Sequence, residues 1–168
     1  YPAELVGVII DDLESGCSVG DIPGLGPAKD IERLIKDTNL RFIFCLYHMD
    51  KMEERFALLQ SYNIPHDRLI NFVHPLAYAS PDLHPGTGNV ILSNATIQAG
   101  VRIGNNNIIN SNVTVEHDTI IGNGNFFSAS ACIGAKVSIG NHCFIGLNAC
   151  IRENVNLGEI FFVGMHSL

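Results

Sequence analysis

The chain has 168 residues, enough for one large or two small domains. Hydrophobic residues make up 46% and charged residues 16%, a balance that indicates a globular protein with a core and excludes a disordered one. The formal net charge of -7 argues against nucleic acid or an anionic membrane as the main partner. No apolar run approaches the length of a membrane span, and the first ten residues lack the basic flank of a signal peptide.

Residues 1–75 have the texture of an α/β domain. Three short apolar runs predict strands, at residues 6–10, 41–46 and 69–73. Apolar residues at helical spacing predict one helix shortly after Pro27 and a second helix over residues 50–60. Strands that alternate with helices indicate a small, Rossmann-like parallel sheet with right-handed crossovers.

Two acidic residues, Asp11 and Asp12, follow the first predicted strand. Because parallel sheets bind ligands at the carboxyl ends of their strands, this pair is a candidate substrate-binding site. A solvated acidic turn explains the same two residues equally well. Residues 76–88 contain several prolines and glycines, so we expect them to form a junction to the rest of the chain.

From Ile91 to Val163 an apolar residue recurs at every sixth position without a miss. The positions are Ile91, Ile97, Ile103, Ile109, Val115, Ile121, Phe127, Ile133, Ile139, Ile145, Ile151, Leu157 and Val163. A period of six fits neither a helix nor an alternating strand, and it predicts a solenoid in which each hexapeptide forms one short strand and one corner. A second inward position, four residues later, is mostly small, as in Ala95 and Val101.

The residue after the apolar position is glycine in seven of the thirteen repeats. We expect these glycines at corners whose backbone conformation a Cβ atom would disfavour. The repeat resembles the left-handed parallel β-helix of bacterial acyltransferases, in which three hexapeptides close one triangular coil. On that pattern the thirteen repeats form about four coils, roughly 4.8 Å apart, and residues 18 apart stack on one another.

Glu116, His117 and Asp118 follow the inward Val115, and Glu116 replaces the more usual glycine. We therefore expect these three residues at a corner, where they project from an edge of the prism. Histidine is the side chain best suited to proton transfer near neutral pH, and a neighbouring carboxylate can hold its tautomer and stabilise the imidazolium. An ordinary polar corner is the alternative interpretation.

Several segments of the chain resemble one enzyme family. They are NSNVTVEHDTIIG at 110–122, CFIGLNACI at 143–151, IIDD at 9–12, GLGP at 24–27 and FVHP at 72–75. All are similar to the bacterial sugar acetyltransferases that modify bacillosamine precursors, perosamine and sialic acid, and the similarity covers nearly the whole chain.

The resemblance implies a role for each residue of the predicted corner. His117 is implied to be the general base, with Glu116 and Asp118 orienting or polarising it. A backbone N–H one coil further on is implied to hold the thioester carbonyl of acetyl-CoA, and the 18-residue step from His117 places it at Ala135, beside Gly134. The family is trimeric, with acetyl-CoA in the groove between neighbouring prisms.

The resemblance also has gaps. Phe126 stands where family members often carry a second histidine, so we expect it near the cofactor with an altered contact. The strand and glycine-rich loop with which the family begins have no counterpart before Val6, so we expect an incomplete amino-terminal domain. The acceptor nucleotide, which the family binds in that domain, is therefore assigned to Asp11 and Asp12.

Two other functions can be weighed against this interpretation. A zinc enzyme of the same fold needs converging histidines, but His117, His142 and His166 are 25 and 24 residues apart, which is not a multiple of 18, so we expect no metal site. A catalytically inactive β-helix scaffold or subunit is the serious alternative. Acetyl-CoA-dependent release of a thiol would separate it from an enzyme.

The sequence therefore predicts an α/β domain over residues 1–75, a junction over 76–88 and a left-handed β-helix over 89–168. We expect an acetyl-CoA-dependent N- or O-acetyltransferase that acts on a sugar, most simply a nucleotide-linked one. The five cysteines lack any CxxC spacing and fit a cytoplasmic protein. We expect a homotrimer with no nucleic acid or membrane partner.

Overall fold

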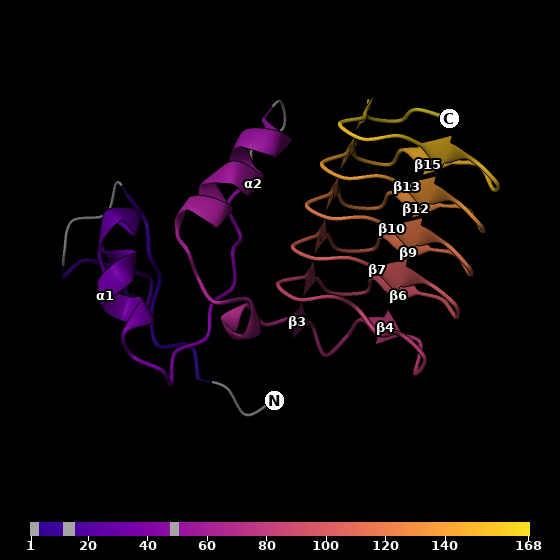
Figure 1. Cartoon of the computed structure of the whole chain (residues 1–168). Coiled ribbons are helices and arrows are strands. Elements are labelled where there is room, and N and C mark those ends of the chain that lie inside the picture. Colours follow the sequence, from indigo (N-terminus) through magenta and orange to yellow (C-terminus); the bar gives the residue numbers. More distant parts are fainter. Residues whose placement is uncertain (1–3, 12–15, 48–50) are drawn as a thin grey trace. The chain divides into compact units, whose positions relative to one another are not determined.

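A computed structural model describes residues 4–11, 16–47 and 51–168. The chain divides into two compact units, residues 1–40 and residues 41–168 (Figure 1). The elements of the first unit are β1 (Ser18–Val19), β2 (Ile22–Pro23), the 3₁₀ helix η1 (Ala28–Asp30) and α1 (Ile31–Ile35). The two strands pair antiparallel. Helix α1 follows Pro27 closely and buries Ile31 and Leu34, in agreement with the predicted helix.

The predicted parallel sheet of residues 1–75 is reduced to single bridges in the described residues. One parallel bridge joins Val8 to Gly24 in the first unit, and another joins Phe42 to Leu69 in the second. Between the latter two lie α2 (Met52–Ser61) and the 3₁₀ helix η2 (His66–Arg68). The expected third strand is missing from this sheet because its last two residues pair with the solenoid instead. None of the described helices is long and apolar enough to cross a membrane.

Most of the second unit is a parallel β-solenoid of two-residue strands (Figure 1). The strands are β3 (Phe72–Val73), β4 (Tyr78–Ala79), β5 (Val90–Ile91), β6 (Thr96–Ile97), β7 (Arg102–Ile103), β8 (Ile108–Ile109), β9 (Thr114–Val115), β10 (Ile120–Ile121), β11 (Phe126–Phe127), β12 (Cys132–Ile133), β13 (Ser138–Ile139), β14 (Phe144–Ile145), β15 (Cys150–Ile151), β16 (Asn156–Leu157) and β17 (Phe162–Val163). They form three parallel sheets, in the orders β16-β13-β10-β7, β17-β14-β11-β8-β5-β3 and β15-β12-β9-β6-β4. Paired residues are 18 apart, for example Ile91 and Ile109, which confirms the predicted stacking.

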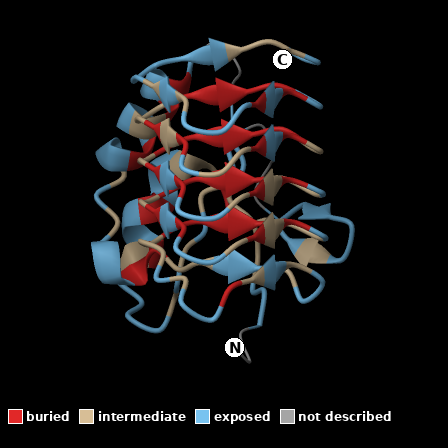
Figure 2. Cartoon of the chain, turned by 90° about the vertical axis from the view of Figure 1, so that its right-hand side faces the viewer, coloured by how far each residue is buried: buried red, intermediate tan, exposed pale blue. Residues whose placement is uncertain are grey.

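The core of the solenoid consists of the residues that the hexapeptide period places inside. Ile91, Ile97, Ile109 and Ile133 have no exposed surface, and the small residue Ala95 fills the space between the larger ones. Figure 2 shows the buried strands stacked above one another along the solenoid. The apolar surface removed from water in this stack is the main source of stability for strands too short to be stable alone.

The solenoid begins one coil earlier than the sequence indicates. Strand β3 pairs with β5, and β4 pairs with β6, so residues 72–88 form a coil of their own below the predicted repeats. The period of six continues backwards through Val73, Ala79 and Pro85. Alanine and proline break the aliphatic pattern there, which is why the sequence predicts a junction in place of a coil.

The explanation predicted for the corner glycines is wrong. The left-handed conformation falls two residues later, at positions such as Asn94 (φ 58°) and Asp118 (φ 59°). The glycines are required by close packing between coils: a Cβ atom on Gly122 would lie 2.6 Å from the carbonyl oxygen of Gly140. Gly158 has no coil stacked on it, and a Cβ atom there would meet nothing within 4 Å.

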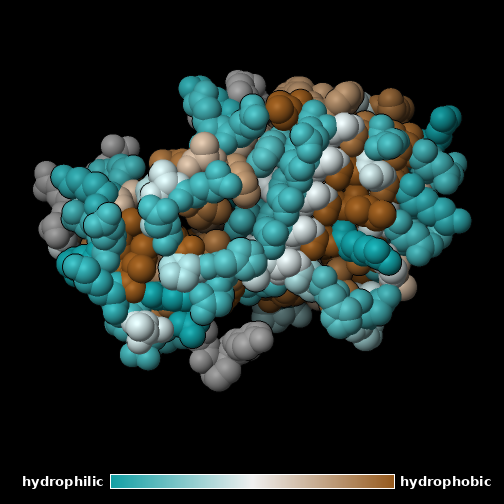
Figure 3. Space-filling model, in the orientation of Figure 1, coloured by the Kyte–Doolittle hydropathy of each residue, from teal (hydrophilic) through white to brown (hydrophobic). Residues whose placement is uncertain are grey.

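One corner is built from buried asparagines that the hexapeptide pattern did not reveal. Asn89, Asn107 and Asn125 have no exposed surface, and the side-chain oxygen of each accepts the backbone N–H of the residue 18 positions later, at 2.7 to 2.9 Å. A second ladder links Asn105, Asn123 and Asn141 in the same way. In Figure 3 a hydrophilic row runs along the solenoid beside a paler row, as expected for these asparagines and the adjoining glycines.

The outer surface of the β17-β14-β11-β8-β5-β3 sheet is covered by the segment around α2. Phe126 and Phe144 pack with Met52 in a buried cluster, and the ring of Tyr47 stacks on Phe126 with 3.9 Å between centroids. Arg55 is 3% exposed, and its guanidinium donates hydrogen bonds to the carbonyl oxygens of Leu46 and Asn106. Burial lowers the pKa of Arg55 to about 10, so it remains charged at neutral pH.

Candidate active site

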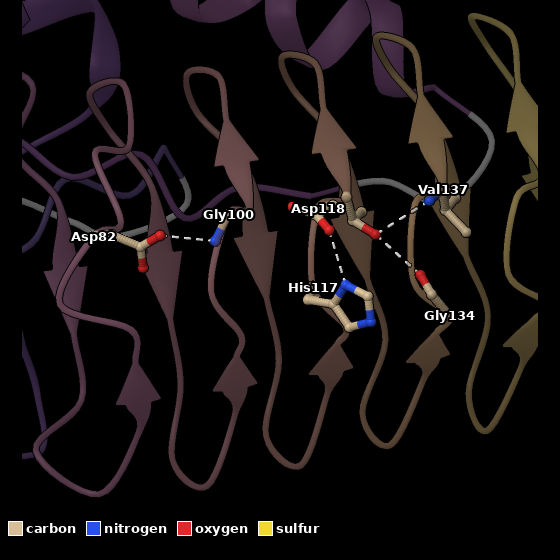
Figure 4. Close-up of polar contacts among 7 residues, drawn as sticks. Asp82, Gly100, His117, Asp118, Gly134 and Val137 are labelled. Atoms are coloured by element: carbon tan, nitrogen blue, oxygen red, sulfur yellow. Dashed lines mark hydrogen bonds and ion pairs between the residues drawn. The ribbon is translucent and has the colours of Figure 1, made fainter.

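The corner between β9 and β10 carries Glu116, His117 and Asp118 on one edge of the solenoid (Figure 4). Backbone pairing holds this corner in place, because the N–H of Glu116 donates to the carbonyl oxygen of Ile133 at 2.9 Å. The side chains of His117 and Asp118 are 52% and 58% exposed. The three residues are therefore presented to solvent on a rigid support, as the sequence predicts for a corner.

His117 and Asp118 form one hydrogen-bonded pair. Nδ1 of His117 lies 2.9 Å from Oδ2 of Asp118. An ionised carboxylate can only accept, so the proton of a neutral imidazole lies on Nδ1 and the lone pair of Nε2 is free. This tautomer is the one that a general base requires, and the adjacent carboxylate stabilises the imidazolium that forms when Nε2 takes a proton.

The backbone on either side of His117 keeps the position of Asp118. The N–H of Asp118 donates to the carbonyl oxygen of Ala99 at 3.1 Å, one coil before. Gly100 leaves room for the carboxylate, since a Cβ atom there would lie 2.5 Å from Oδ1 of Asp118. Asp118 therefore depends on a glycine 18 residues before it.

Thr119 ties the His117 coil to the next one, and sequence reasoning missed it. Its side chain is buried, its hydroxyl donates to the carbonyl oxygen of Gly134 at 3.0 Å, and it accepts the N–H of Val137 at 3.2 Å (Figure 4). The signal was present in the sequence: a polar residue occupies an inward position where the repeats carry valine or alanine.

Ala135 lies one coil beyond His117 and at the same place in its corner. No acceptor among the described residues receives its backbone N–H. At another corner the equivalent N–H of Asn123 donates to Oδ1 of Asn141 at 2.7 Å. Gly134, just before it, packs tightly, because a Cβ atom there would lie 2.6 Å from the backbone nitrogen of Glu153. The small side chains of Ala99 and Ala135 flank the His117 column and leave the imidazole accessible.

A pocket of about 570 Å³ adjoins this corner on the coils that precede His117. Asp82, His84, Gly100, Arg102 and Asp118 line it. Oδ2 of Asp82 accepts the N–H of Gly100 at 2.8 Å, and the hydroxyl of Ser80 donates to the other oxygen. These bonds, that of Ser80 above all, lower the pKa of the Asp82 carboxyl, so it is ionised at neutral pH. The sequence analysis assigned these residues no chemistry apart from Asp118.

The other predicted site residues lie elsewhere. Phe126 belongs to a different sheet from the His117 corner and is buried in the aromatic stack under α2. In the first unit, Oδ1 of Asp11 accepts the N–H of Ala28 at 2.8 Å, so one carboxylate oxygen is used to hold the start of η1. Asp12 lies outside the described residues. Because Asp11 and His117 belong to different units, their functions are considered separately.

No family model matches the sequence, and no curated protein matches it either. Solved structures do match. PerB from Caulobacter crescentus, in complex with CoA and GDP-perosamine, is 25% identical with a TM-score of 0.79, over 90% of this chain and 71% of that chain. The acetyltransferase domain of PglB from Neisseria gonorrhoeae FA1090 is 23% identical with a TM-score of 0.84, over 95% and 77%.

A third structure is a mutant of GDP-perosamine N-acetyl transferase from Caulobacter crescentus, also in complex with CoA and GDP-perosamine. It is 23% identical with a TM-score of 0.80, over 94% of this chain and 74% of that chain. The predicted likeness to hexapeptide-repeat sugar acetyltransferases is therefore confirmed.

Proposed function

We propose that this protein transfers an acetyl group from acetyl-CoA to an amine or hydroxyl of a nucleotide-linked sugar. The acyltransferase class and acetyl-CoA as co-substrate are confirmed by the neighbours, which are acetyltransferases solved in part with CoA. The nucleotide-linked acceptor is proposed by analogy with the GDP-perosamine bound to two of them. The single observation in this chain that carries the proposal is the hydrogen bond between His117 and Asp118.

His117 acts as the general base in this reaction. Its Nε2 accepts the proton of the acceptor amine or hydroxyl as that group attacks the thioester carbonyl. The positive charge that appears on the ring is stabilised by the Asp118 carboxylate 2.9 Å from Nδ1. Glu116 adds a second negative charge at the same corner. Collapse of the tetrahedral species releases coenzyme A as the thiol, which receives the proton from His117.

The backbone N–H of Ala135 is the proposed donor to the thioester carbonyl oxygen. The described residues leave this N–H without an acceptor, and it lies one coil, roughly 4.8 Å, from the His117 corner. A donor already in place where negative charge develops stabilises the transition state without reorganisation. Gly134 holds the close approach of the coils that sets its position.

A screen for coenzyme A release tests the proposal. The purified protein is incubated with acetyl-CoA and UDP-, GDP- or CMP-linked amino sugars, and free thiol is measured. Release that needs both substrates and falls on replacing His117 supports an enzyme. Absence of release with every acceptor, while the protein remains folded, would favour the inactive scaffold.

We also propose that the active form is a homotrimer in the cytoplasm. An edge site such as His117 is open on the outside of one prism, and a neighbouring copy would enclose it. The cytoplasm is the compartment in which acetyl-CoA and nucleotide sugars are both available.

A further inference from the structure

The pocket beside His117 lies on the side of the corner away from Ala135. Ala135 belongs to the coil that follows His117, whereas Asp82, Gly100 and Arg102 belong to the coils that precede it. The general base therefore separates the proposed thioester position from an unassigned space of about 570 Å³. An acceptor must approach His117 from a direction that the thioester does not occupy, and this pocket offers one.

Arg102 is the pocket's free cation. It is the outward residue of β7 and is exposed. No carboxylate among the described residues forms an ion pair with it, although two carboxylates line the same pocket. His84 stands one coil before Arg102, 18 residues earlier, and lines the pocket as well. A guanidinium with its donors unused is suited to two-pronged binding of a phosphate.

The two carboxylates are already engaged with other donors. Asp82 accepts from Gly100 and Ser80, and Asp118 accepts from His117. Both have therefore a defined role in positioning the corner, and neither is placed to neutralise Arg102. Gly100 has φ 72° and no side chain, so the floor of the pocket between them stays open.

We propose that Arg102, assisted by His84, binds a phosphate group of the acceptor and that this pocket is the acceptor subsite. The inference rests on the proposed acetyltransferase function. Phosphate is also present in coenzyme A, but the pocket lies on the opposite side of His117 from Ala135, which favours the acceptor. The substrate class that follows is a sugar carrying a phosphate or diphosphate ester.

Binding measurements test the subsite without requiring turnover. UDP-N-acetylglucosamine, GDP-mannose and CMP-sialic acid are titrated by calorimetry into wild type, Arg102→Gln, Arg102→Lys and Arg152→Gln, each with CoA present. We expect wild type to bind at least one probe and Arg102→Gln to bind it about 10- to 100-fold more weakly, the loss expected for one charge-assisted hydrogen bond. Arg102→Lys keeps the charge and should retain part of the affinity. Arg152 is an exposed arginine that does not line the pocket, and its variant should bind within about twofold of wild type.

Two results would overturn the inference: none of the probes binds wild type, or Arg102→Gln binds as wild type does. Steady-state kinetics then separate the two sources of phosphate. An increase in KM for the acceptor alone supports the acceptor subsite, whereas an increase in KM for acetyl-CoA alone would assign Arg102 to coenzyme A. A wild-type protein that binds a nucleotide sugar but never releases coenzyme A would contradict the proposed function and leave the subsite standing.

Discussion

The imidazole of His117 is held by one neighbour, the Asp118 carboxylate, and is otherwise open to solvent. Its reactivity therefore depends on local geometry that a single substitution can remove. The acidic residues on both sides follow directly in the sequence, so the chain supplies base and orienting group within three consecutive residues. Neither depends on a distant segment for its identity, only for its rigidity.

Replacing His117 by alanine should lower kcat by about 10²- to 10⁴-fold, because a general base contributes an amount of this size. KM for acetyl-CoA should change little, since the proposed contact to the thioester is the backbone N–H of Ala135. Initial rates of coenzyme A release provide the measurement. His142→Ala is the control, because His142 lies at a different corner, against Phe56. Near-wild-type turnover in His117→Ala would remove this residue from the mechanism.

Asp11 carries a second prediction, that it contributes to binding the acceptor nucleotide. Its Oδ1 already accepts the N–H of Ala28, so Asp11→Ala would disturb η1 as well as any ligand. Asp11→Asn keeps an acceptor oxygen for Ala28 and removes the charge. We expect Asp11→Asn to raise KM for the nucleotide sugar severalfold and to leave KM for acetyl-CoA unchanged. If calorimetry shows normal acceptor binding, Asp11 is a structural cap only.

Each coil of the solenoid is stabilised by its fit against the next. Glycines allow the corners to approach closely, and buried asparagines satisfy backbone N–H groups that the apolar core could not. Strand length contributes little, because every strand has two residues. The repeating element is therefore defined by contacts between coils, which explains why its corner chemistry differs from one edge of the prism to another.

The glycines allow a direct test of this account. Gly122→Ala should lower the free energy of unfolding by about 1–3 kcal/mol, the usual cost of overpacking, because its Cβ atom would lie 2.6 Å from the Gly140 carbonyl oxygen. Gly158→Ala should be neutral or slightly stabilising, since nothing lies within 4 Å of its Cβ position. Chemical denaturation of both variants measures the difference. Equal destabilisation of the two would show that corner conformation, and not packing, selects glycine.

For the molecule as a whole, the open question is assembly. The outer surface of the solenoid near the site is partly apolar: Ile120, beside the His117 corner, is 50% exposed. Exposed apolar side chains at the edge of a rigid prism favour association with further copies. A closed ring of three would cover such residues and enclose the His117 edge.

We predict a homotrimer at micromolar concentration. Light scattering coupled to size exclusion should therefore report three times the mass of the chain. Ile120→Asp should shift the protein toward monomer and reduce turnover together, whereas Leu147→Asp, at an exposed position on a different corner, serves as the comparison. A monomer with full activity would contradict this prediction.

The hexapeptide period by itself determined the solenoid, its inward residues and the 18-residue stacking, because a strand and a corner of constant length must repeat in space as they do in sequence. Counting within that period was also sufficient to place Glu116, His117 and Asp118 at one corner and Ala135 one coil beyond. Only the tertiary structure decided which groups meet across coils: the Asp118 carboxylate above Gly100, the Thr119 hydroxyl between coils, and Arg102 in the same pocket as Asp82. The same is true of the coil at residues 72–88 and of the bridges that replace the predicted sheet, since pairing there depends on distant strands and leaves no period in the sequence.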